Sequence, residues 1–168
     1  MVQLNLTQAD FDKIEAIYDI KLPNEFKQAY ANIEVDIPYF YAWNDFSSEN
    51  VARIKARICQ PKEDLINSLD EFDWLEDRWG EEPSDITEKN ARILQMIANA
   101  PQILPIAGHR YIAEGEGDIS PVISIVGLDC IYYAPSLTEF VATGGNYHEQ
   151  PYLYDYVQIP FWTDVMEQ

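Results

Sequence analysis

Residues 114–118, with the sequence EGEGD, place carboxylates at alternate positions, a spacing that resembles the opening of a calcium-binding loop. The rest of the calcium-loop pattern is missing, because its sixth position is Ile119 rather than glycine and its twelfth is Ile125 rather than glutamate. The spacing therefore favours a solvated hairpin loop, and we predict no metal site.

Two histidines, His109 and His148, are the available imidazole bases, and no serine or cysteine lies in a nucleophile motif such as G-x-S-x-G. His109 precedes Arg110 in a predicted turn, where we expect its ring to fix the turn by hydrogen bonding. Carboxylate pairs can be picked from 29 acidic residues in many ways, so they carry no information. Since phosphate loops, dinucleotide fingerprints and zinc spacings are also missing, the sequence predicts neither an enzyme nor a cofactor.

The two cysteines, Cys59 and Cys130, each lie in an apolar pattern without a second cysteine or a histidine at ligand spacing. This predicts two buried free thiols rather than a disulfide or a metal site. The first residues show neither a basic start nor an apolar run of signal-peptide length, and no run approaches membrane-spanning length. We therefore expect a cytoplasmic protein.

The net charge of −18 arises from 29 acidic and 11 basic residues, in a chain that is 47% hydrophobic and therefore able to fold. Such a field repels nucleic acids and anionic membranes, and it accelerates encounter with a basic protein. An acidic surface can also serve only to keep a protein in solution, so the positions of the acids matter. The composition leaves both a monomer and a homodimer open.

The acidic segment, residues 70–85 with the sequence DEFDWLEDRWGEEPSD, interleaves its acids with large aromatic residues. One interpretation is that Trp74 and Trp79 dock into the core while the acids face water. The alternative is an acidic surface, anchored by aromatic residues, that binds a basic protein partner.

Apolar spacing at three and four residues predicts several helices, which must position these residues. Thr7 and Asp10 have the spacing of a capping box, and Pro23 is placed as a first-turn proline. The predicted helices cover residues 6–18, 23–33, a stretch beginning at Ser47 or Ser48, a further short stretch from Pro61, 86–99 and 136–143. For the helix over 86–99 the expected apolar face consists of Ile86, Ile93, Leu94, Met96 and Ile97.

Short β-branched and aromatic runs between residues 103 and 134 predict a β-meander, with Pro105 at an edge or a strand start. The run PVISIV is apolar on both faces, which predicts a central strand covered on both sides. A loop of Gly127, Leu128 and Asp129 joins it to the next strand. We predict a loop with an edge strand over residues 34–46. For the aromatic tail we predict an added strand or a packed extended segment.

These patterns predict one α+β domain over residues 1–168, with a core of about 6–143 and an aromatic tail of 144–168. Its sheet, antiparallel or mixed, is expected to be packed by the N-terminal and central helices.

Two regions resemble the SUKH superfamily, which includes fungal cell-wall-assembly regulators and many bacterial immunity proteins. The first is LTQADFDKIEAIYDIKLPNEFKQAY, residues 6–30. The second comprises LPIAGHRYI, PVISI, DCIYY and LTEF, with DRWG upstream. The order and spacing of these pieces, which span most of residues 6–140, carry the resemblance.

The resemblance implies a non-enzymatic α+β domain that binds and neutralises a cognate protein toxin, frequently a nuclease. A regulatory or scaffold domain of the same fold, with no toxin partner, is the alternative. The predicted contact surface is Glu71, Asp73, Trp74, Glu76, Asp77, Glu81 and Glu82, with Glu114, Glu116 and Asp118 as a second candidate patch.

Overall fold

The computed structural model describes residues 2–146 and 156–168. They form one α+β domain with two antiparallel sheets, which confirms the predicted fold class. The helices are α1 (Gln8–Tyr18), α2 (Asn24–Ala31), α3 (Ser48–Asn67), the 3-10 helix η1 (Leu69–Glu71), α4 (Glu76–Trp79), α5 (Ile86–Asn99), α6 (Leu137–Ala142) and α7 (Trp162–Val165). The strands are β1 (Val2–Leu4), β2 (Ile33–Val35), β3 (Ile103–Ala107), β4 (Arg110–Ala113), β5 (Val122–Val126) and β6 (Asp129–Ala134).

The predicted capping box at the start of α1 is confirmed. The side chain of Thr7 accepts from the amide of Asp10, and the carboxylate of Asp10 accepts from the amide of Thr7 at 2.8 Å. The second helix is shorter than predicted, because Pro23 is its N-cap and Ile33 belongs to β2. Ile33 leaves the helix because it pairs with Leu4 of β1.

Helix α3 runs through Pro61 without a break, so the prediction of a separate helix from Pro61 is wrong. Proline removes one helical hydrogen bond and costs about 3 kcal/mol in a helix interior. Ile54, Ile58, Pro61 and Leu65 recur at spacings of four and three and are all buried. Burial of this continuous stripe offsets the cost of the proline.

The predicted meander is confirmed as an antiparallel sheet in the order β3-β4-β5-β6. Pro105 lies in β3, at the edge of this sheet. Val122 and Ile123, which point to opposite faces of β5, are both fully buried, as a strand covered on both sides requires. The loop after β5 is one residue shorter than predicted, because Asp129 already pairs with Val126.

The helix over 86–99 has the predicted bounds, but its apolar face is narrower than predicted. Ile93 and Ile97, one turn apart, are buried, while Ile86 and Leu94 are exposed. Leu94 lies about 100° around the helix from Ile93 and so points away from the core. Ile86 lies in the first turn, where the rest of the domain does not cover it.

The tail adds a helix rather than a strand in its described part. Residues 157–159 belong to no helix or strand, and α7 follows, with a buried Trp162 whose indole N–H donates to the Pro101 carbonyl at 2.9 Å. The core therefore also takes in residues after 143, namely Tyr156, Ile159, Phe161, Trp162 and Val165.

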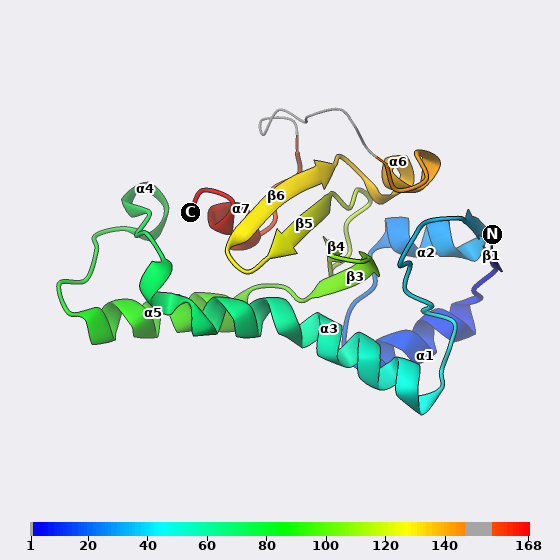
Figure 1. The fold of residues 1–168 in the computed structure, drawn as a ribbon, viewed down its shortest axis with the longest axis horizontal. Helices are drawn as coiled ribbons and strands as arrows, with labels where there is room; N and C mark the ends of the chain where they lie inside the picture. Colours follow the sequence, from blue (N-terminus) through cyan, green and yellow to red (C-terminus); the bar gives the residue numbers. More distant parts are fainter. Residues whose placement is uncertain (1, 147–155) are drawn as a thin grey trace.

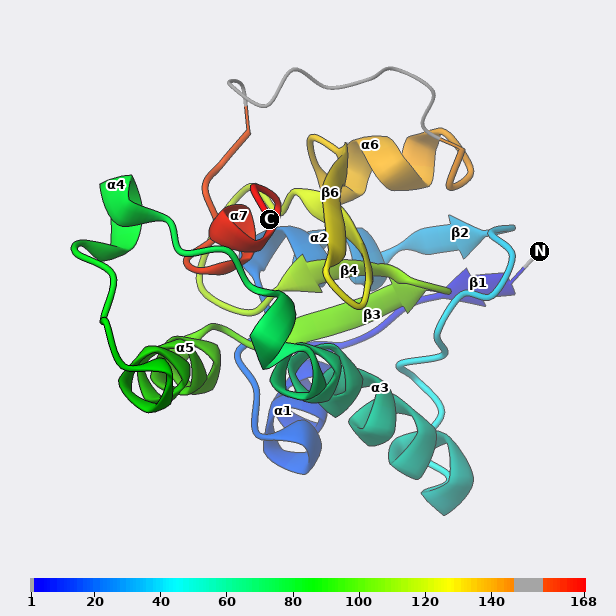
Figure 2. The ribbon, with the colours of Figure 1, turned by 60° about the vertical axis from the view of Figure 1, so that its left-hand side comes forward.

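Figures 1 and 2 show α1, α3 and α5 along one side of the four-stranded sheet and α6 on the other. Both views place α4 at the end of the molecule where the chain terminates, and the N-terminus at the opposite end (Figure 1). This arrangement brings the acidic segment next to the last residues of the chain.

Candidate interaction surface

The acidic segment links α3 to α5 and is fixed by aromatic side chains. Phe72 is buried, and its ring lies against that of Phe161 with centroids 6.5 Å apart. The rings of Trp74 and Trp79 meet edge to face at 5.3 Å and pack against the core cluster that contains Phe72. Aromatic packing therefore holds the segment on the body of the domain.

Both tryptophans are half-buried, and both indole N–H groups have acceptors. Trp74 donates to the carbonyl of Gly80 at 2.7 Å, within the segment. Trp79 donates to Oδ2 of Asp164 in α7 at 2.9 Å. Docking of the tryptophans, the first interpretation of the sequence, is what the structure shows. A contact role for Trp74 stays a prediction.

The last residues of the chain hold the segment in place. Arg78 donates to Oδ1 of Asp164 at 2.6 Å and also pairs with Glu167. The hydrogen bond that Arg78 donates to Asp164 and the negative charges of Asp164 and Glu167 raise the pKa of Arg78. The amide of Asp73 donates to the side chain of Gln168 at 2.8 Å. Asp164, Glu167 and Gln168 lie 86 to 95 residues from their partners, so local sequence patterns gave no signal for them.

The acidic side chains of the segment are exposed to solvent. All six predicted contact acids of the segment are exposed: Glu71, Asp73, Glu76, Asp77, Glu81 and Glu82. Nearby basic side chains are already paired, since Lys89 binds Glu82 at 2.7 Å and Arg92 binds Glu88 at 2.6 Å. The segment therefore presents a fixed surface with a surplus of negative charge.

The second candidate patch mostly holds the β4–β5 loop to the N-terminal helices. The carboxylate of Glu114 accepts from the amides of Lys21 at 3.1 Å and Gln102 at 2.8 Å. Asp118 accepts from the side chain of Asn24 at 2.9 Å, and Glu116 pairs with Lys21 at 3.9 Å. The loop is exposed at Glu116 and Asp118, as predicted, but its carboxylates already have partners.

Helix α5 lies between parts of the two patches. Asp85 in the acidic segment caps the start of α5, while Glu114 binds the amide of Gln102 just beyond its end. A helix of 14 residues is about 21 Å long. Glu82, which binds Lys89 in α5, and Glu114 therefore lie near opposite ends of this helix.

The two cysteines differ in burial. Cys130 is buried, which raises the pKa of its thiol to about 12, whereas Cys59 is exposed on α3 and its predicted burial is wrong. Cys59 lies one position beyond Ile58 on the helix, so it points away from the buried stripe. His148 lies outside the described residues. Among the described residues no three histidine, cysteine or acidic side chains are grouped to hold a metal.

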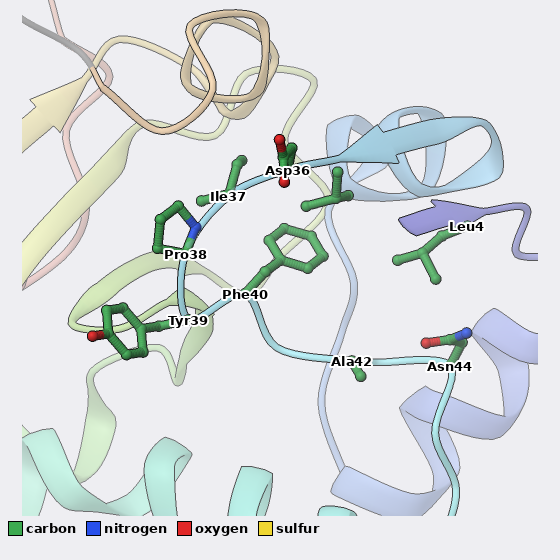
Figure 3. A pocket seen from close by; sticks show the side chains of 9 residues that line it. Leu4, Asp36, Ile37, Pro38, Tyr39, Phe40, Ala42 and Asn44 are labelled. Carbon is green, nitrogen blue, oxygen red and sulfur yellow. The ribbon is translucent and has the colours of Figure 1, made fainter. Parts of the chain in front are cut away.

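A pocket of about 400 Å³ opens between the end of β2 and the connection to α3 (Figure 3). Its lining is mainly apolar and carries a single carboxylate, that of Asp36. The lining residues are Leu4, Val35, Asp36, Ile37, Pro38, Tyr39, Phe40, Ala42 and Asn44. This lining has no pair of titratable groups arranged for acid–base catalysis.

Comparisons of the chain with protein-family models, with curated proteins and with solved structures find no match. Within residues 2–146 and 156–168, no helix has the length and apolar character needed to cross a membrane.

Proposed function

We propose that this protein is a non-enzymatic protein-binding domain that neutralises a cognate bacterial toxin by direct contact through its acidic segment. The resemblance of residues 6–140 to the SUKH superfamily supports the toxin as partner. The charge of −18 supports a basic partner and disfavours nucleic acid.

The observation that carries the proposal is the fixed exposure of the acids. The segment is bound to the body through Trp79 and Arg78, so its carboxylates need little further ordering when a partner binds. A stability role alone does not require exposed acids at Glu76 and Asp77, and neither carboxylate forms an ion pair within residues 2–146 and 156–168.

The same charge accounts for both recognition and inhibition. A negative surface attracts a basic toxin at long range and speeds encounter, an effect that salt weakens. If the toxin is a nuclease, its substrate groove is basic because it must neutralise phosphates. The exposed carboxylates can occupy that groove and exclude the nucleic acid.

Co-expression with the product of the neighbouring gene tests this function. We expect the neighbour to be toxic when expressed alone, and the wild-type chain to restore growth and to co-purify with it. A non-toxic neighbour that nevertheless co-purifies would replace the proposal by a regulatory or scaffold role. Restored growth without any physical association would contradict neutralisation by contact.

A further inference from the structure

Three arginines of this acidic protein form no close ion pair among the described residues. Arg53, Arg57 and Arg110 form none of the ion pairs found there. Each guanidinium instead lies over a tyrosine ring: Arg53 over Tyr41 at 5.3 Å, Arg57 over Tyr111 at 5.7 Å, and Arg110 over Tyr133 at 3.9 Å. Hydrogen bonds from Ser47 and the charge of Arg53 lower the pKa of Asp45, so Arg53 still acts on a nearby carboxylate.

Two of these arginines flank the turn between β3 and β4. Nη2 of Arg57 donates to the Gly108 carbonyl at 3.1 Å, and Arg110 begins the next strand. His109 is exposed at the tip. Desolvation lowers its pKa, and the positive charges of Arg110 and Arg57 lower it further, against the opposite effect of Asp129. The charges of Arg57 and Arg110 thus act at this turn, and Asp129 is the acid that acts against them.

Tyr39 lies beside this turn in an unfavourable conformation. Its φ is +60°, a region that bulky residues rarely adopt, and its side chain is 86% exposed. The backbone is held there because the Gly108 amide donates to the Tyr39 carbonyl at 3.1 Å and Phe40 bridges to Ala107. Figure 3 shows the Tyr39 ring pointing away from Phe40, on the other side of the loop. The fold thus presents an aromatic ring that contributes little to the core.

Exposed apolar residues continue from the turn across the sheet. Arg110 pairs with Ser124, and Ser124 pairs with Ile131, so the three side chains form one cross-strand row. Ile131 is 52% exposed, and Val126, on the same face two residues after Ser124, is 63% exposed. Arg110 therefore shares this face with Val126 and Ile131, and with the exposed Asp129 that pairs with Val126, while Tyr39 lies beside the turn.

We propose a second docking site on this face, for a protein segment that presents a carboxylate beside an apolar side chain. The site consists of Tyr39, His109, Arg110, Val126 and Ile131. The carboxylate pairs with Arg110, whose guanidinium is already oriented by Tyr133 and by Ser124 at 2.9 Å. The apolar side chain covers the exposed residues on either side. A polyanion such as nucleic acid fits less well, because the molecule as a whole repels it.

Two small probes test this site without any toxin, so the outcome does not depend on the proposed function. N-acetyl-L-leucine carries the carboxylate and the apolar side chain, and N-acetyl-L-leucinamide lacks only the charge. In ¹H–¹⁵N spectra of the full chain at low salt, we expect the acid to shift the amides of residues 108–110, 124–126 and 131, with millimolar affinity. N-acetyl-L-leucinamide should bind at least about fivefold more weakly, because it loses one charge-assisted hydrogen bond.

Two variants sharpen the test. Arg110→Gln should remove the preference for the acid over the amide. Tyr39→Gly should weaken both probes while leaving the melting temperature unchanged or higher, since glycine adopts a φ of +60° freely. Arg92→Gln, on an exposed face of α5, is the matched control and should change neither affinity.

Equal binding of both probes, or shifts that lie elsewhere, would overturn the proposal. Stronger shifts of the same amides by inorganic phosphate or by a short oligonucleotide than by N-acetyl-L-leucine would also overturn it, because the site would then select anions without regard to an apolar neighbour.

Discussion

The indole N–H of Trp79 and the carboxylate of Asp164 are 2.9 Å apart, and this bond joins the acidic segment to the last helix of the chain. Arg78 reaches the other oxygen of the same carboxylate at 2.6 Å. One acid of α7 thus holds two consecutive residues of α4, while the acids before and after them face solvent. The negative surface is positioned by a contact across 85 residues.

Replacing Trp79 by phenylalanine tests this anchoring. The ring contacts remain but the N–H is lost, so we expect a loss of about 1 kcal/mol in the free energy of unfolding. Hydrogen exchange should accelerate at the amides of 73–82 while those of β5 stay protected, since the core is intact. The matched variant Trp74→Phe loses a bond inside the segment, to Gly80, and should leave α7 unaffected. Unchanged exchange in Trp79→Phe would show that packing alone holds the segment.

The buried carboxylate of Glu25 should be a major local source of stability. It accepts from the amide of Ser120, and from the amide and hydroxyl of Thr138 at 2.9 and 2.7 Å, tying α2 to the β4–β5 loop and to α6. Glu25→Ala leaves these donors unpaired, so we expect a loss of about 3 kcal/mol, measured by urea unfolding. The exposed Glu34→Ala should cost less than about 0.5 kcal/mol. Similar losses in the two variants would refute the role of Glu25.

The two cysteines should differ in reactivity. Cys59 is exposed, whereas burial raises the pKa of Cys130 to about 12 and keeps it a thiol near neutral pH. In the native protein a thiol reagent such as Ellman's reagent should modify one equivalent, and Cys59→Ser should abolish the reaction. The second equivalent should appear only in denaturant. Rapid labelling of Cys130 in native Cys59→Ser would mean that the sheet opens readily.

Acid should weaken the connection between α1 and α2. Burial raises the pKa of Glu15. Hydrogen bonds from Lys27 and from the Leu22 amide, each at 2.9 Å, lower it, and together with the charge of Lys27 they outweigh burial, so the net shift of the pKa is downward. A carboxyl with a lowered pKa stabilises the fold above its ordinary pKa, and this contribution is lost as pH falls through the lowered value. The melting-temperature difference between wild type and Glu15→Gln should therefore shrink between pH 7 and about pH 3. A melting-temperature difference that stays constant over this pH range would contradict a stabilising role for the Glu15 carboxylate.

Local signals predicted most of the secondary structure. The capping box of Thr7 and Asp10, the helix from Ile86 to Asn99 and the meander all depend on residues close in sequence, and they appear as predicted. The continuity of α3 was not predicted, because the local cost of Pro61 is offset only by packing against the sheet and α5.

The candidate site was predicted less completely. The exposure of the acids follows from their charge, but the partners that fix them do not. Nothing near Asp164 in the sequence indicates that it binds Trp79 and Arg78. Likewise the sequence places Glu114 in an exposed loop, yet its carboxylate accepts hydrogen bonds from two backbone amides of other segments. Long-range hydrogen bonds of this kind depend on the tertiary fold.

The salt dependence of association with the neighbouring gene's toxic product tests the central claim most directly. Stopped-flow rates should be compared for wild type, for Glu76→Lys with Asp77→Lys, and for Asp12→Lys with Glu34→Lys, which gives the same net charge far from the acidic segment. We predict that the first pair slows association about tenfold at low salt and flattens its salt dependence, while the second pair has a much smaller effect. Equal effects of the two pairs, or none, would contradict the assignment of the acidic segment as the binding surface.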